Sequence, residues 1–172
     1  SDTILEKAIE LTWKGLDTAT TVDTATSQEI FFAQGGCMTS FGSALSSLGQ
    51  ASLVSLAIES RYKIDSSLTT TILLPYIIEE ASKYKGDKLA QIAFIMGLSN
   101  NPSDIQTNID ALLEEIRTKI ALANLPARLK ELSVSIEQLA LCAEDAGALE
   151  IMNGLSRSMT SDDLFELIKQ AY

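Results

Sequence analysis

Acidic side chains, a lysine and a run of hydroxyls are the residues of this chain whose types could perform chemistry. Glu79-Glu80 and Glu114-Glu115 are adjacent carboxylate pairs, and paired carboxylates can share acid and base roles. Consecutive residues of a helix point about 100° apart, so neither pair converges on one substrate. We therefore interpret both pairs, together with Glu144-Asp145, as charged residues on solvated helix surfaces.

The lysine and the hydroxyl groups that could take part in chemistry lie between residues 63 and 71. Lys63 and Asp65 occupy a predicted loop, where functional residues are more frequent than in a core, and the hydroxyls that follow could bind a polar molecule. A helix N-cap at Ser66 or Ser67 explains part of this cluster without any ligand. A lysine base would need a lowered pKa, and nothing in the sequence indicates the burial that would lower it.

Histidine is absent from all 172 residues. Imidazole titrates near neutral pH and is the commonest transition-metal ligand, so its absence excludes several kinds of site within this chain. These are Ser-His-Asp and Cys-His nucleophilic systems, histidine-containing zinc sites and imidazole acid–base catalysis. Cys37 and Cys142 lie far apart and outside any C-x-x-C pattern, so we expect two small buried hydrophobic residues.

Charge and length restrict the class of protein further. The chain has 23 acidic and 13 basic residues, a net charge of -10, and no Lys/Arg cluster, so no nucleic-acid partner is expected. No apolar stretch approaches the roughly 20 residues of a membrane span, and the N-terminus lacks a signal pattern. With 46% hydrophobic residues, residues 1–172 are expected to form a single cytoplasmic domain that does not contact membranes.

Apolar residues recur at spacings of three and four along the chain, which predicts an all-α domain. Polar patterns predict the helix starts at Thr3 with Glu6, Thr26 with Glu29, Ser103, Ser135 with Gln138, and Thr160 with Asp163. Pro75 is expected to kink the helix that contains it, and residues 84–87 to end that helix. Gly35, Gly36 and Gly42 are expected to be close-packing positions of a central helix, with Phe32 and Phe41 in a core or an interface.

Residues 49–76 carry Gly49, Arg61-Tyr62, Ile64, Leu68 and Ile72-Leu73-Leu74-Pro75 in a register that resembles the C-terminal domain of iron-containing (group III) alcohol dehydrogenases. Segments 88–97, 125–132 and 157–172 resemble further patterns of that family, in the same order. The resemblance covers nearly the whole chain. It implies an all-α, multi-helix bundle of the dehydroquinate synthase-like type, and the family's nucleotide-binding α/β domain is absent from these residues.

In that family an aspartate and three histidines hold the active divalent metal. The resemblance aligns two of these histidines with Ser52 and Ser66, and a further pocket histidine of many members with Leu56. The other ligand pair would precede residue 1. A serine hydroxyl is a poor ligand for a transition metal compared with imidazole, so we expect no metal, no cofactor and no catalytic residue in this chain.

We therefore predict a dehydrogenase-like helical domain that is noncatalytic and acts as a structural or interaction module, with a protein partner or a second copy. One alternative is the C-terminal part of a longer or two-chain NAD(P)-dependent alcohol dehydrogenase. Another is a small-molecule binding module, whose vestigial pocket would include Lys63, Asp65, Ser67 and Thr70. The last is a metal-independent enzyme that uses Lys63 or a carboxylate.

Overall fold

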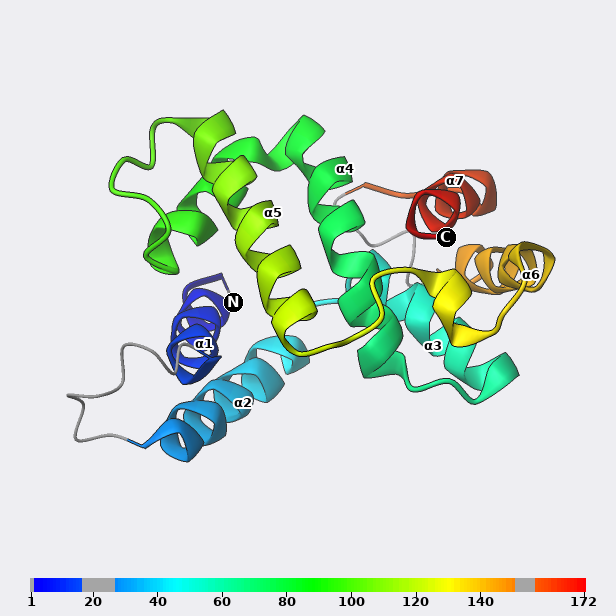
Figure 1. The fold of residues 1–172 in the computed structure, drawn as a ribbon, viewed down its shortest axis with the longest axis horizontal. Helices are drawn as coiled ribbons and strands as arrows, with labels where there is room; N and C mark the ends of the chain where they lie inside the picture. The colour runs from blue at the N-terminus through cyan, green and yellow to red at the C-terminus, as the bar shows by residue number, and fades with distance from the viewer. Residues whose placement is uncertain (1, 17–26, 151–156) are drawn as a thin grey trace. The chain divides into compact units, whose positions relative to one another are not determined.

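The computed structural model describes residues 2–16, 27–150 and 157–172, and every regular element in these ranges is helical, as predicted (Figure 1). No helix in these ranges is both long and apolar enough to cross a membrane. The elements in chain order are α1 (Asp2–Leu16), α2 (Gln28–Ala44), α3 (Gln50–Tyr62), α4 (Ser66–Ile95), α5 (Ile105–Leu122), the 3-10 helix η2 (Leu129–Leu132), α6 (Ile136–Gly147) and α7 (Ser161–Ala171).

Contacts between Cα atoms divide the chain into two compact units. Unit 1 contains Ser1–Ser46 and Lys85–Leu112, and unit 2 contains Ser47–Tyr84 and Leu113–Tyr172. Helix α4 passes from unit 2 into unit 1 at Lys85, where φ of -136° and ψ of 30° interrupt the helical backbone. The interruption therefore lies at the predicted stop near residue 85, and the backbone angles remain helical at Pro75.

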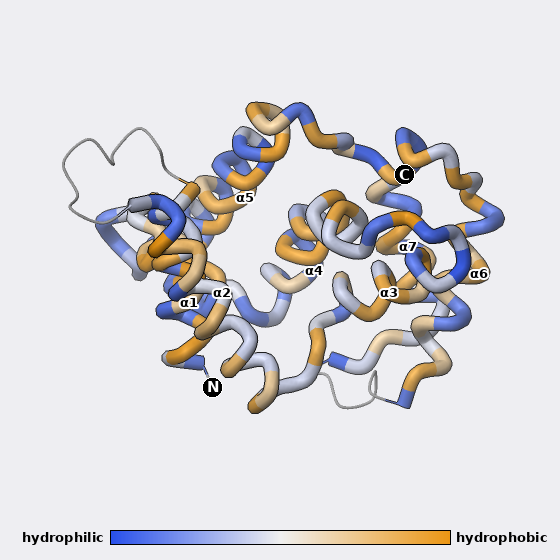
Figure 2. The backbone as a smooth tube through the Cα atoms, turned by 90° about the horizontal axis from the view of Figure 1, so that it is seen from below, coloured by the Kyte–Doolittle hydropathy of each residue, from blue (hydrophilic) through white to orange (hydrophobic). Residues whose placement is uncertain are grey.

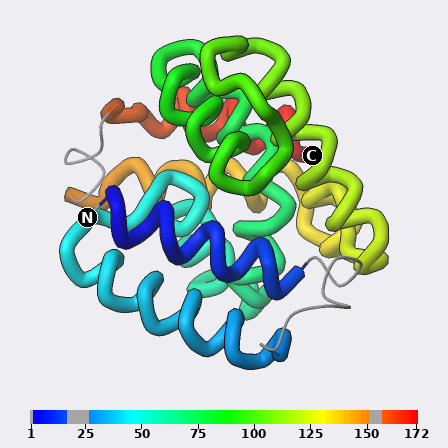
Figure 3. Tube along the Cα trace, turned by 90° about the vertical axis from the view of Figure 1, so that its left-hand side faces the viewer, coloured from blue at the N-terminus to red at the C-terminus, as the bar shows by residue number. Residues whose placement is uncertain are grey.

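In unit 1, α1 and α2 lie side by side (Figures 1 and 3). Two glycines of α2 permit this approach: a Cβ atom on Gly35 would lie 2.5 Å from Thr12 Oγ1, and one on Gly42 would lie 2.9 Å from Leu5 Cγ. A Cβ atom on Gly36 would meet nothing within 4 Å. The close-packing prediction is thus confirmed for Gly35 and Gly42. It is wrong for Gly36, because this position of the helix faces away from α1.

The remaining surface of α2 is more exposed than the sequence predicted. Gly35 and Gly42 are its buried residues, whereas Phe41 is 59% exposed and Cys37 is exposed too. The expectations of a central helix and of a buried Cys37 are therefore wrong. The reason is that α1 covers only one side of α2, whereas the apolar residues of α2 lie on several sides. In Figure 2 these hydrophobic residues are coloured orange.

Unit 2 has a continuous hydrophobic core, to which α3, α4, η2, α6 and α7 contribute. Helix α3 packs against α6, and α6 packs against α7. Cys142 of α6 is fully buried as expected, and burial raises the pKa of its thiol to about 11. The fully buried side chains of this core include Leu53, Val54, Ile58, Leu73, Leu164 and Ile168.

The first residues of α6 and α7 agree with the capping patterns of the sequence. Ser135 with Gln138 and Thr160 with Asp163 form the predicted capping boxes. The other predictions fail or lie outside the described residues. Thr3 already lies inside α1, Thr26 is not described, and the N-cap of α2 is Ser27.

Helix α5 begins after Asp104, not Ser103. The Asp104 carboxylate accepts a bond from the Thr107 N–H, and its carbonyl accepts one from the Asn108 N–H. A carboxylate at this position also interacts favourably with the positive end of the helix dipole.

Candidate functional site

The turn between α3 and α4 contains most of the residues that the sequence singled out. Helix α3 ends at Tyr62, and Lys63 adopts a left-handed conformation with φ of 57°, in which its N–H donates to the Glu59 carbonyl at 2.9 Å. The Lys63 ammonium donates to the Ser60 carbonyl at 3.1 Å. A cation bound to the last carbonyls of a helix stabilises the negative end of its dipole, so both contacts of Lys63 terminate α3.

Asp65 caps α4. Its Oδ1 atom accepts hydrogen bonds from the Ser67 N–H at 2.8 Å, the Leu68 N–H at 3.2 Å and the Ser67 hydroxyl. The Ser67 hydroxyl, followed by the Leu68 and Ser67 N–H groups, holds the pKa of Asp65 below its usual value. The predicted cap at Ser66 or Ser67 is therefore wrong, because the carboxylate one position earlier takes that role.

The threonine hydroxyls that follow are mostly used inside α4. Thr69 is fully buried and donates to the Ser66 carbonyl at 3.1 Å, while Thr71 donates to the Ser67 carbonyl at 2.8 Å. Thr70 is half-buried on the same helix. Of the four residues that the sequence suggested for a pocket, Lys63, Asp65 and Ser67 thus make contacts that define the helix ends.

Ser52 and Leu56 lie four residues apart on α3, so they share one face of that helix. Ser52 is half-buried, Leu56 is 43% exposed, and Ser66 is the half-buried first residue of α4. Ser55, between the first two, is fully buried and its hydroxyl has no hydrogen-bond partner. Across the described ranges, no three His, Cys, Asp or Glu side chains are grouped closely enough to hold a metal ion.

Of the acidic residues that the sequence placed on solvated helix surfaces, Glu114 and Glu144 are exposed as expected. Glu79, Glu80 and Asp145 instead pair with arginines. Arg61 of α3 binds both oxygens of Asp145 on α6, with Nη2 2.8 Å from Oδ1, and this bond lowers the pKa of Asp145. Arg117 of α5 pairs with Glu79 of α4. The sequence marked Arg61 only as part of the family pattern, and it did not predict either ion pair because the partners are distant in the chain.

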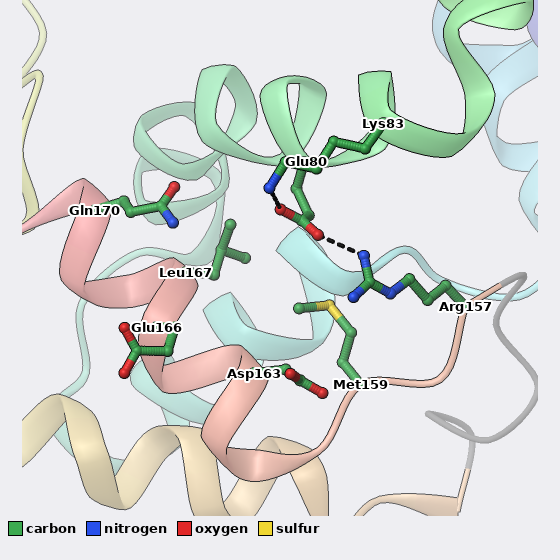
Figure 4. Close-up of a pocket in the computed structure, with 8 residues that line it drawn as sticks. All are labelled: Glu80, Lys83, Arg157, Met159, Asp163, Glu166, Leu167 and Gln170. Atoms are coloured by element: carbon green, nitrogen blue, oxygen red, sulfur yellow. Dashed lines mark hydrogen bonds and ion pairs between the residues drawn. The ribbon is translucent and has the colours of Figure 1, made fainter.

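Glu80 lies at the edge of a cavity of about 220 Å³ between α4 and α7 (Figure 4). Lys83 binds one of its oxygens and Arg157 Nη1 lies 2.5 Å from the other. The hydrogen bond from Lys83 is the largest cause of the lowered pKa of Glu80, and the contact with Arg157 adds to it. The guanidinium of Arg157 also lies 5.5 Å from the centroid of the Tyr84 ring.

The other acidic residues of this cavity also have structural partners. Asp163 accepts hydrogen bonds from the N–H and hydroxyl of Thr160, both at 2.9 Å, and these bonds lower its pKa. Glu166 pairs with Lys169. Glu80 therefore attaches the segment before α7 to α4, Asp163 caps α7, and Glu166 forms an ion pair within α7.

The comparisons with known proteins identify the fold. Residues 1–172 match the model of the C-terminal part of the Fe-containing alcohol dehydrogenase family. Among solved structures, a 1,3-propanediol oxidoreductase matches with a TM-score of 0.85 and 18% identity, over 99% of this chain and 45% of that one. An alcohol dehydrogenase from Oenococcus oeni matches with a TM-score of 0.81 and 20% identity, with the same coverage. No curated protein matches.

An all-helical fold with this sequence pattern defines the class: the chain belongs to the C-terminal domain of the Fe-containing alcohol dehydrogenase family. It spans less than half the length of the two solved structures. At 18% and 20% identity, these structures establish the fold alone.

Proposed function

We propose that this chain is a helical domain of the iron-containing alcohol dehydrogenase family that holds no catalytic metal and acts as a structural or interaction module. The observation that carries the proposal is the set of side chains at the positions that the resemblance aligns with metal ligands. These are Ser52 and Ser66, with Leu56 in place of a pocket histidine. Two neutral hydroxyls and a leucine do not fit a ferrous or zinc ion that requires imidazole donors.

Nearby groups do not compensate for these replacements. Asp65 is the carboxylate next to Ser66, but its Oδ1 atom already accepts three hydrogen bonds that begin α4. The Lys63 ammonium is a cation, which opposes the binding of a divalent metal. A Lewis acid that polarises an alcohol oxygen would therefore lack a protein site within these residues.

The exposed apolar side of α2 supports an interaction role. Ile30 is 45% exposed, Phe41 59% and Leu45, the C-cap residue, 57%. No acidic or basic residue occurs between Glu29 and Glu59, although the chain has a net charge of -10. An apolar, uncharged surface is the kind that another polypeptide covers.

A second candidate function is the C-terminal part of a longer or two-chain NAD(P)-dependent alcohol dehydrogenase. The observation in its favour is that the chain corresponds to 45% of the length of each of the two solved dehydrogenase structures. In this arrangement another polypeptide segment would supply the nucleotide-binding half. The replacements at Ser52 and Ser66 would still leave such an assembly without two imidazole donors.

An assay of alcohol oxidation tests the noncatalytic proposal. Purified protein is supplied with NAD or NADP, a short primary alcohol or diol, and either ferrous or zinc ions, and reduced nicotinamide is followed by absorbance. We expect no metal-dependent rate above the protein-free control. Turnover that appears on adding the metal and disappears with a chelator would refute the proposal. Turnover that appears only after a second polypeptide co-purifies would favour the second candidate.

A further inference from the structure

Unit 2 contains a second cavity, of about 280 Å³, whose lining differs from that of the cavity beside Glu80. Helix α4 contributes Ile72 and Pro75, α5 contributes Arg117, Ile120 and Ala121, and the segment after α5 contributes Arg128. Figure 1 shows this segment running from the end of α5 past α4 toward α6. The cavity thus has walls from three parts of one compact unit.

The inner wall of this cavity is apolar. Ile72 is 1% exposed, Ile120 is 8% exposed, and Pro75 is buried in α4. Known ligand pockets are mostly apolar with a few placed polar groups, and this cavity is just below their usual lower size of about 300 Å³. Its inner wall therefore suits the apolar body of a small molecule.

The charged groups that line the cavity are two arginines, Arg117 and Arg128, and none of its described lining residues is acidic. This sign is opposite to that of the whole chain, which has 23 acidic and 13 basic residues. A guanidinium binds carboxylates with paired N–H donors, which makes arginine suited to organic acids. The lining therefore selects for a negative ligand within an acidic protein.

Both arginines are positioned by contacts with neighbouring groups. Arg117 pairs with Glu79, and Arg128 donates from Nη1 to the Gln170 carbonyl at 2.6 Å. The Arg128 guanidinium also lies 5.6 Å from the centroid of the Tyr76 ring. Each guanidinium carries five N–H donors, and these hydrogen bonds use one of them in each side chain. The remaining donors can bind an anion without breaking these contacts.

We propose that this cavity binds a small organic carboxylate, with its apolar body against Ile72, Pro75 and Ile120 and its carboxylate between Arg117 and Arg128. The proposal requires neither a metal nor a nicotinamide cofactor, so it holds or fails independently of the proposed function. The Arg117 side chain is 48% exposed, and water competes with an exposed ion pair. The expected dissociation constant is therefore about 1 mM.

A titration with hexanoate, followed by the amide resonances of the isotopically labelled protein, tests the proposal. We expect saturable shifts at Ala121, Ala127 and Arg128, and much weaker binding of hexanamide, which has the same chain without the charge. Arg117→Gln and Arg128→Gln should each weaken hexanoate binding about tenfold. Lys130→Gln removes an exposed cation that does not line the cavity, and it should leave binding unchanged.

Arg128 also holds the Gln170 carbonyl, so Arg117→Gln decides the outcome if Arg128→Gln unfolds the protein. Ala121→Phe provides a second measure, because a phenyl ring at this lining position would fill the cavity and abolish binding. Absence of saturable shifts, equal binding of hexanamide, or unchanged binding by Arg117→Gln would each overturn the proposal. Shifts that saturate only at residues remote from the cavity would overturn it as well.

Discussion

Asp65 illustrates how a residue suited to chemistry can serve structure instead. Its carboxylate holds the first turn of α4 through the N–H groups of Ser67 and Leu68 and through the Ser67 hydroxyl. These bonds lower its pKa in the folded protein. A carboxyl group with a lowered folded pKa stabilises the fold above its unfolded pKa, and this contribution is lost as the pH falls through the folded pKa.

Asp65→Ala is therefore expected to lower the free energy of unfolding at pH 7 and to lower it less at acidic pH. The difference from wild type should be constant above about pH 5 and should shrink at lower pH as the wild-type carboxyl becomes protonated. Urea denaturation between pH 3 and 7 measures it. Ser66→Ala is the control, because Ser66 does not cap the helix; a pH-independent difference for Asp65→Ala, or an equal effect of both variants, would contradict this role.

Individual contacts between distant residues could not be predicted from the sequence. The patterns identified Glu80 and Asp145 as surface carboxylates, but their partners Arg157 and Arg61 lie far away in the chain. Such pairs form only when helices pack in three dimensions, and spacing along one helix contains no information about them. The sequence could not show that Arg117 and Arg128 line one cavity for the same reason.

Among the elements, the α1–α2 pair shows most clearly how a local residue choice controls packing. A Cβ atom at Gly35 would approach not only the Thr12 hydroxyl but also backbone atoms, with Thr12 N at 3.2 Å and the Ala8 carbonyl oxygen at 3.3 Å. Backbone atoms cannot move aside as a side chain can. The two helices would have to separate, and separation exposes apolar surface.

Gly35→Ala is expected to lower the free energy of unfolding by about 1–3 kcal/mol, the usual cost of overpacking. Gly36→Ala, one position later on the same helix, is a matched control because its Cβ atom would meet nothing within 4 Å. Alanine is favoured over glycine inside a helix, so this variant should be neutral or stabilised by up to about 1 kcal/mol. Thermal and urea denaturation provide the values, and equal destabilisation by both variants would be incompatible with the packing described.

The sequence predicted the existence of the helices well and their first residues less well. The capping boxes at Ser135 with Gln138 and Thr160 with Asp163 were identified correctly, whereas Thr3 with Glu6 has the same pattern but lies inside α1. Where two residues that can cap a helix are adjacent, as at Ser103 and Asp104, the pattern could not distinguish them. Periodicity also marks apolar positions without showing how many sides of a helix are covered, so it could not show that Phe41 is exposed. Cys37 was expected to be buried because free cysteines usually are, and it is exposed as well.

At the scale of the whole molecule, the ordered motifs over residues 49–172 predicted the all-α family fold correctly. The division into two compact units was not visible in the sequence. The chain passes between the units three times, once in the connection between α2 and α3 and twice inside helices α4 and α5, where no linker marks the boundary. The interruption at Lys85, beside Gly86, is the one local feature of α4 that coincides with it.

The proposal that Ser52 and Ser66 occupy former ligand positions is tested by two matched pairs of substitutions. A Ser52→His/Ser66→His variant restores two imidazoles and is expected to retain more zinc than wild type. A Ser40→His/Ser60→His variant adds two imidazoles at exposed positions of α2 and α3 and should not retain more than wild type. Equal retention by the two variants would contradict the assignment.

The metal content of the purified wild-type protein tests the central claim most directly. Protein is incubated with ferrous or zinc ions and desalted. The metal content per chain is then measured by inductively coupled plasma mass spectrometry for wild type and the two histidine variants. A chain whose aligned ligand positions are Ser52 and Ser66 is predicted to retain far less than one ion per chain. Retention of about one ferrous or zinc ion per wild-type chain would contradict the account.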